Sequence, residues 1–411
     1  LRFPRIYRYI LREVSGPFFI SLFIFTGILF LARIIRLVDL VINKNVPLGD
    51  IIVLFSMIIP RFLEMALPMW LLLGILLAFG RLSADSELIV MRSAGVSLRR
   101  LSRPVLIFAC FAFLITLLVS LVIRPWANYR LGVGLFEIAK QRTSAGLIAG
   151  VFNEFGPLTI YAGEIGADTG RMKNVIIADD RDPATPHTFV AQNGRLVSND
   201  QQRTLSLKLY NGTIHQGSGL TYNVTAFDVN NINLSLEELE EGGPTKDGKK
   251  TSEMYLSELR QTTNELEARK PHLTEEESRD LSQALVEWHR RFVVPVSCLC
   301  IAFVAMALGI QPSRGGATWG TVVNVTVGIL VIVFYYIFLA GVTALCRSDI
   351  APVWVLMWIP NLCVALLALW MFRLMDSERW LTVTQAVGHF FTGIAKRFRM
   401  SEPKTEAPVE E

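Results

Sequence analysis

Hydrophobic residues along this chain gather in six long runs, three before and three after a long polar insert. The runs lie near 17–38, 51–79, 102–123, 292–310, 318–343 and 352–374. Each has close to the ~20 apolar residues that a helix needs to cross a hydrocarbon layer of ~30 Å. The pattern predicts an α-helical membrane protein with six transmembrane helices, arranged 3+3 around one inserted domain.

The insert has a different period. Between about 143 and 235, polar and apolar residues alternate, most clearly over 204–210 (TLSLKLY), and Asn-Gly pairs at 193–194 and 211–212 resemble hairpin turns. This pattern predicts an all-β, jelly-roll-like sandwich of about eight short strands.

These changes of pattern divide the chain into five parts. They are a first transmembrane half with a loop helix near 83–95 (1–142), the β-sandwich and a linker (143–250), returning helices (251–291), a second transmembrane half (292–376) and an amphipathic tail (377–411).

Basic residues concentrate at the N-terminus, between the second and third runs, and after the sixth. By the positive-inside rule, both termini lie in the cytoplasm and the β-domain lies on the far side of the membrane. A hydrophobic fraction of 52% and a mean hydropathy of +0.41 agree with a multi-pass protein.

No catalytic or cofactor motif stands out. The stretch 243–250 (GPTKDGKK) matches part of a phosphate-binding loop, but it lacks the Ser or Thr that reaches Mg²⁺ and no buried strand precedes it. The five cysteines lie in or beside apolar runs, and the histidines of the insert have no metal-ligand spacing. We expect a non-catalytic chain without a metal or a cofactor of its own, and no nucleic-acid partner.

The loop 80–101 (GRLSADSELIVMRSAGVSLRRL) carries the most specific local signal. Ser83 or Asp85 can cap a helix whose first turn holds Glu87, and Gly95 can end it after about three turns. Leu88 and Met91, three residues apart, share one face of this helix. The helix could therefore offer an apolar knob and a carboxylate to a partner. The alternative is an interfacial connector whose apolar side lies among lipid headgroups.

Three segments carry a resemblance to a known family: IYRYILRE at 6–13, SADSELIVMRSAGVS at 83–97, and WHRRFVVPVSCLCIAFVAMALGI at 288–310 with a following RGG. Over Ile6 to about Leu374 the chain resembles the LptF/LptG permeases of the lipopolysaccharide-export ABC transporter, and the LptF branch more closely. The resemblance implies that the loop helix is a coupling helix that docks into an ATPase. Its contact residues would be Glu87, Leu88, Met91 and Arg92.

The same resemblance implies a location and partners. The chain would be a multi-pass protein of the cell inner membrane that extracts lipopolysaccharide for delivery to the outer membrane. Its partners would be a cytoplasmic ATPase dimer, which supplies ATP and Mg²⁺, a second six-helix subunit (LptG-like), a periplasmic β-jelly-roll bridge protein and lipopolysaccharide.

Charged residues in or beside the apolar runs are further candidates. The planar guanidinium group suits phosphate, so arginines near the outer ends of the runs could bind a phosphorylated lipid headgroup. They are Arg33, Arg36, Arg124, Arg290 and Arg291. Alternatively, they are anchors that reach the membrane surface. Arg61 and Glu64, three residues apart inside the second run, are predicted to form a cavity ion pair.

Two other classes of function stay open. An ion-coupled secondary transporter would need more buried acids than Glu64 and would work without an ATPase. A membrane-anchored enzyme would show hydrolytic activity in the isolated insert, although the insert has no nucleophile or metal motif.

Overall fold

The computed structural model describes residues 5–44, 48–146, 149–155, 158–166, 171–180, 187–199, 204–218, 221–234, 249–310, 317–346 and 352–375. The chain forms two compact units. One comprises 1–125 and 255–411, and the other comprises 126–254. The predicted tail 377–411 and most of the stretch 243–250 lie outside the described residues.

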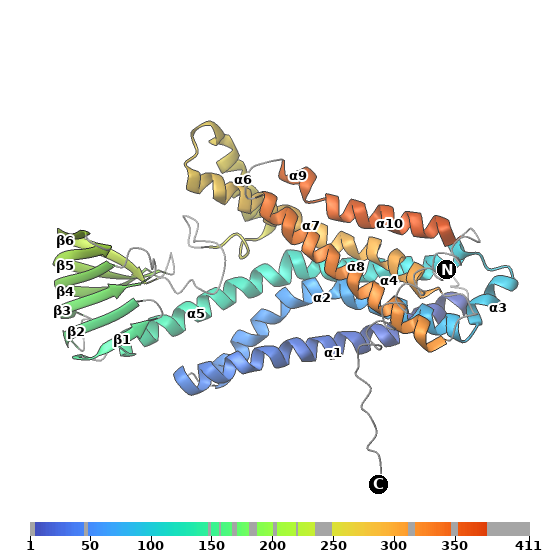
Figure 1. Cartoon of the computed structure of the whole chain (residues 1–411), viewed down its shortest axis with the longest axis horizontal. Helices are drawn as coiled ribbons and strands as arrows, with labels where there is room; N and C mark the ends of the chain where they lie inside the picture. Colours follow the sequence, from blue (N-terminus) through green and yellow to red (C-terminus); the bar gives the residue numbers. More distant parts are fainter. Residues whose placement is uncertain are drawn as a thin grey trace, which may run out of the picture. The chain divides into compact units, whose positions relative to one another are not determined.

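The first unit is helical. Its elements are α1 (Arg5–Lys44), α2 (Leu48–Ala84), α3 (Glu87–Ser93), α4 (Leu98–Leu118), the π-helical turn η1 (Val119–Ile123), α5 (Arg124–Gly146), α6 (Leu256–Ala268), the 3₁₀ turn η3 (Lys270–His272), α7 (Glu275–Gly309), α8 (Ala317–Cys346), α9 (Val353–Leu356) and α10 (Ile359–Met375) (Figure 1). Helix α5 continues into the second unit.

Six helical stretches of the described chain are long and apolar enough to cross a membrane, in agreement with the predicted 3+3 arrangement. They are Arg5–Ile28, Ile52–Ala84, Leu98–Glu137, Glu277–Gly309, Val323–Cys346 and Val353–Leu374. The most apolar windows of the second and fourth stretches are 72% buried, against 24% to 33% for the others. Helices α2 and α7 are therefore the centre of the bundle, and the others leave an apolar face for lipid or for another protein.

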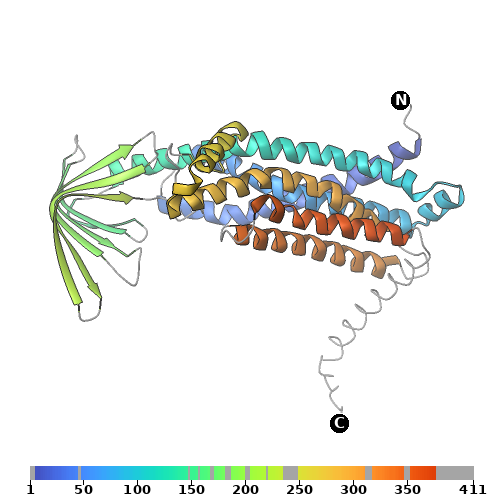
Figure 2. The same cartoon turned by 90° about the horizontal axis from the view of Figure 1, so that it is seen from above.

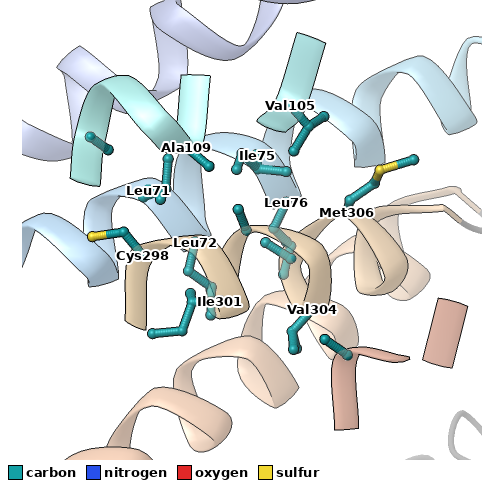
Figure 3. Packing of buried hydrophobic residues seen from close by; sticks show 14 of the residues in the cluster. Leu71, Leu72, Ile75, Leu76, Val105, Ala109, Cys298, Ile301, Val304 and Met306 are labelled. Atoms are coloured by element: carbon teal, nitrogen blue, oxygen red, sulfur yellow. The ribbon is translucent and has the colours of Figure 1, made fainter. Parts of the chain in front are cut away.

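Close packing of α2, α4 and α7 makes the core of this unit (Figure 3). Leu71, Leu72, Ile75 and Leu76 recur at helical spacing on α2 and are fully buried. They pack among Val105 and Ala109 of α4 and Cys298, Ile301, Val304 and Met306 of α7.

The second unit holds one antiparallel sheet of six described strands in the order β1-β2-β3-β4-β5-β6. The strands are β1 (Phe152–Phe155), β2 (Leu158–Ile165), β3 (Arg171–Asp179), β4 (His187–Asn199), β5 (Thr204–Ser218) and β6 (Thr221–Leu234). The sheet is strongly curved (Figure 2). Its inner face buries an apolar cluster that includes Ile160, Val175, Ile177 and Leu209. The described strands confirm an antiparallel β-domain but not the eight strands of a jelly-roll-like sandwich.

Both Asn-Gly pairs that resemble turns lie inside long strands. Asn211 has the left-handed φ of 53° that asparagine tolerates, so β5 continues through it without a hairpin. A Cβ on Gly212 would collide with the Val190 carbonyl oxygen and lie 2.6 Å from the Phe227 ring. Glycine at this position lets the β4 backbone and the Phe227 ring of β6 lie close to β5. The prediction of turns at the two Asn-Gly pairs was therefore wrong.

Candidate functional site

Helix α3 is a short, well-defined element between two membrane-crossing stretches. It begins after Ser86, whose φ of 58° is left-handed and whose side chain makes no capping hydrogen bond. It ends in a Schellman motif, in which the Val96 N–H bonds to the Met91 carbonyl and the Gly95 N–H to the Arg92 carbonyl. The predicted C-terminal glycine is confirmed, whereas the predicted caps Ser83 and Asp85 lie before the helix and its length is shorter than three turns.

Gly95 should fix the end of α3 through its backbone conformation. Its φ is 83°, and a Cβ there would meet no atom within 4 Å, so a substitution is disfavoured by conformation alone. We expect Gly95→Ala to cost roughly 1 kcal/mol locally. Amide hydrogen exchange over 87–96 should speed up about fivefold. Gly16→Ala, at an open helical position in α1, is the control and should leave this exchange unchanged.

The side chains of α3 divide differently from the prediction. Leu88 is only 4% exposed and belongs to the core, and Met91 packs against the same core. Ile89 and Val90 are 47% and 65% exposed. The apolar surface that α3 offers therefore consists of Ile89 and Val90, and Leu88 holds the helix to the bundle. Arg92 is exposed beside them.

A polar cluster joins α3 to the first turns of α1 and the last turns of α2. We call Tyr9, Glu13, Arg81, Asp85 and Glu87 the α3 cluster. The Tyr9 hydroxyl donates a 2.6 Å hydrogen bond to Glu87 Oε2. Arg81 lies 2.8 Å from Glu13 Oε1 and 3.6 Å from Asp85 Oδ2. The Tyr9–Glu87 and Arg81–Glu13 contacts connect residues far apart in the sequence, which is why local spacing did not reveal Tyr9.

A second group of charges is buried deep in the bundle. We call Glu64 of α2, Arg124 at the start of α5, and Glu287, Arg290 and Arg291 of α7 the membrane ion cluster. Arg124 bridges the two acids, with Nη1 3.1 Å from Glu64 Oε2 and 3.0 Å from Glu287 Oε1. Arg291 Nε donates to Glu287 Oε1 at 3.2 Å, and Arg290 Nη1 lies 3.7 Å from Glu287 Oε2. The side chains of Glu64, Arg124 and Arg291 are at most 3% exposed.

The π-helical turn η1 contributes a further contact to this cluster. Ser120, inside η1, donates a 2.7 Å hydrogen bond to Glu64 Oε1. Arg124 follows directly after η1. Single π-turns inside α-helices are rare and are often found at functional sites. The turn places a hydroxyl and a guanidinium on the same carboxylate.

The Glu64 carboxylate has partners that sequence spacing did not indicate. It contacts Arg124 and Ser120, on another membrane stretch, and its predicted ion pair with Arg61 stays a prediction. The Arg61 side chain is exposed on α2 and is itself engaged with neighbouring groups. A charge in this environment requires a partner, and the fold supplied one that sequence spacing could not.

The arginines predicted to bind lipid phosphate fall into two groups. The side chains of Arg33 and Arg36 lie outside the described residues, although α1 includes both positions. Arg124 and Arg291 are buried against Glu287, and the Arg290 side chain is 19% exposed. Of the three described arginines, Arg290 is thus the most accessible to a ligand. No group of three His, Cys, Asp or Glu side chains with metal-binding geometry occurs among the described residues.

Comparison with known proteins gives one family over nearly the whole chain. The family model described as lipopolysaccharide export system permease LptF/LptG matches residues 8–374. The lipopolysaccharide export system permease protein LptF of Escherichia coli is 26% identical over 220 residues, which are 52% of this chain and 59% of that protein. LptG of Haemophilus influenzae is 31% identical over 90 residues, 22% of this chain and 25% of LptG. An uncharacterized protein of Rickettsia prowazekii is 22% identical over 305 residues, 73% of this chain and 80% of its own length.

Proposed function

Because the chain belongs to the LptF/LptG family of lipopolysaccharide export permeases, we propose that it is a non-catalytic permease subunit that extracts lipopolysaccharide from the outer leaflet of the inner membrane. The observation that carries the proposal is α3. This helix sits between two membrane-crossing stretches and exposes Ile89 and Val90 next to the Glu87 carboxylate. An apolar pair beside a fixed charge is the surface that an amphipathic helix presents to a partner groove.

The partner at α3 would be a cytoplasmic ATPase. Coupling a chemical energy source to this permease requires a contact outside the membrane, and the basic residues that flank α3 in its loop favour the cytoplasmic side. The apolar faces left on α1 and α8, with Phe23 82% and Phe334 66% exposed, would face lipid or a second six-helix subunit. Lipopolysaccharide would enter between the two subunits, and ATP-driven closing would expel it.

Lipid phosphate would be bound at the membrane rim by arginine. Arg33 and Arg36 of α1 stay our first candidates because they lie one helical turn apart near the end of an apolar run. Arg290 is the next, since its guanidinium is partly accessible at the edge of the membrane ion cluster. Arg124 and Arg291 would act indirectly, by neutralising the negative charge of the acids beside Arg290.

The β-domain would receive the lipid on its way to a periplasmic bridge protein. Each acyl CH₂ exposed to water costs ~0.8 kcal/mol, so the lipid needs an apolar surface once it leaves the membrane. The apolar cluster on the inner face of the curved sheet would become such a surface when the sheet opens, because its residues are buried in the free chain. In the described sheet β6 pairs only with β5, and Tyr222, Val224 and Val229 on it are at least half exposed. An open edge of this kind can extend into a partner's sheet by strand addition.

Co-purification tests the proposal. The chain would be expressed with its candidate ATPase and sister permease, as wild type and as Glu87→Ala, and ATP hydrolysis would be measured on the purified complexes. We expect the wild type to retain both partners. Glu87→Ala should lower ATPase association or turnover at least about tenfold, because α3 loses the carboxylate that would contact the ATPase. A wild-type chain that purifies alone and transports or hydrolyses a substrate unaided would refute the assignment.

A further inference from the structure

The Glu87 carboxylate is already held by a residue of another helix before any partner is present. Tyr9, in the first turns of α1, donates to Glu87 Oε2 at 2.6 Å, although 78 residues separate the two positions. The Tyr9 side chain is 39% exposed, so the bond lies at the surface where a partner would dock.

A free glutamate side chain on a surface helix samples several rotamers, and ordering it on binding costs conformational entropy. The Tyr9 phenol removes part of that freedom in advance. A carboxylate accepts on both oxygens, so a single bond at Oε2 leaves Oε1 available to a cation of the partner. The geometry therefore favours a pre-positioned acceptor over a masked one.

Further contacts connect the helices around this position. Arg81, near the end of α2, is 2.8 Å from Glu13 of α1, one helical turn after Tyr9. Leu88, the residue after Glu87, is buried in the core. Helices α1, α2 and α3 are thus connected by two polar contacts and one apolar contact at this end of the bundle.

We propose that Tyr9 is a positioning residue for the docking carboxylate Glu87. The inference rests on the proposed function, because it concerns the same docking surface. It adds a specific contact: α1, which carries the candidate phosphate residues Arg33 and Arg36, would reach the docking carboxylate through the Tyr9–Glu87 hydrogen bond.

The test is a double-mutant cycle on the assembled permease pair in nanodiscs, with the purified ATPase subunit as the titrant. Tyr9→Phe deletes only the hydroxyl and keeps the ring. We expect it to weaken ATPase binding about fivefold to tenfold, the scale for loss of one ordinary hydrogen bond at an exposed site. In the Glu87→Ala background the same change should have no further effect, because the bond it removes is already lost.

Tyr7→Phe is the matched control, since it deletes the same hydroxyl from a buried tyrosine two residues away on α1. It should bind the ATPase like the wild type. Equal binding by wild type and Tyr9→Phe, or an equal loss with and without Glu87, would overturn the inference while leaving the proposed function intact. A wild-type pair that fails to bind the ATPase at all would overturn the proposed function and the inference with it.

Discussion

Replacing Glu287 by alanine is expected to destabilise the helical unit strongly. Glu287 is buried and contacts three arginines: Arg124 at 3.0 Å, Arg291 at 3.2 Å and Arg290 at 3.7 Å. Removing it leaves those positive charges without their shared counter-ion in a region that water does not solvate. Breaking a buried pair by deleting one partner costs about 3–5 kcal/mol. For a unit of this size that loss corresponds to a fall of about 10 °C in the melting temperature.

The measurement is thermal unfolding of the detergent-solubilised full chain, followed by the loss of its monodisperse peak in size-exclusion chromatography. Glu164→Ala is the control. Glu164 also forms an ion pair, with Lys173 at 2.7 Å, but both side chains are about two-thirds exposed on the β-domain. An exposed pair contributes little to stability, so this variant should melt with the wild type. If Glu287→Ala and Glu164→Ala behave alike, the membrane ion cluster does not stabilise the bundle.

The sequence predicted the six membrane stretches because each one is a local property of about 20 consecutive residues. It could not predict the partners inside the bundle. Arg124 and Glu287 are in contact although 163 residues separate them, and the sequence around either residue does not indicate the other. Spacing suggested Arg61 for Glu64, since residues three apart on a helix are neighbours. It gave no sign of Ser120 and Arg124, which the packing of the bundle brings to the same carboxylate.

The β-domain shows the same limit in another form. Alternation at period two correctly predicted strands, because it reflects one buried face. The Asn-Gly pairs were misleading, since asparagine and glycine also serve to change the course of a continuous strand. Only the pairing of β4 with β5 on both sides of Asn211 distinguishes the two cases.

Helix α3 was located from its neighbours in sequence, but its orientation was not. Seven residues make about two turns, and either side of such a helix can face the bundle. Two contacts decide which side does so: Leu88 enters the core, and the Schellman motif turns Val96 inward after the helix ends. The exposed side then consists of Ile89 and Val90. The spacing of three residues between Leu88 and Met91 did not indicate this.

This orientation leads to a prediction that separates docking from folding. Val90→Asp places a charge on the most exposed apolar side chain of α3, at 65%. The free chain should fold and melt like the wild type, because the new carboxylate is solvated. Association with the proposed ATPase partner should fall by more than about tenfold, since docking would bury that charge without a counter-ion.

Leu88→Asp makes the opposite test with the same chemical change two residues away. Leu88 is 4% exposed, so an aspartate there is buried among apolar side chains even in the free chain, and the melting temperature should drop before any partner is added. Val224→Asp, on an exposed position of β6 in the other unit, controls for added charge and should alter neither property. Both quantities come from one preparation of each variant, by thermal unfolding and by titration with the ATPase. Loss of ATPase binding in Leu88→Asp at unchanged stability, together with normal binding by Val90→Asp, would mean that α3 presents its other face to the partner and that the bundle must release Leu88 for docking.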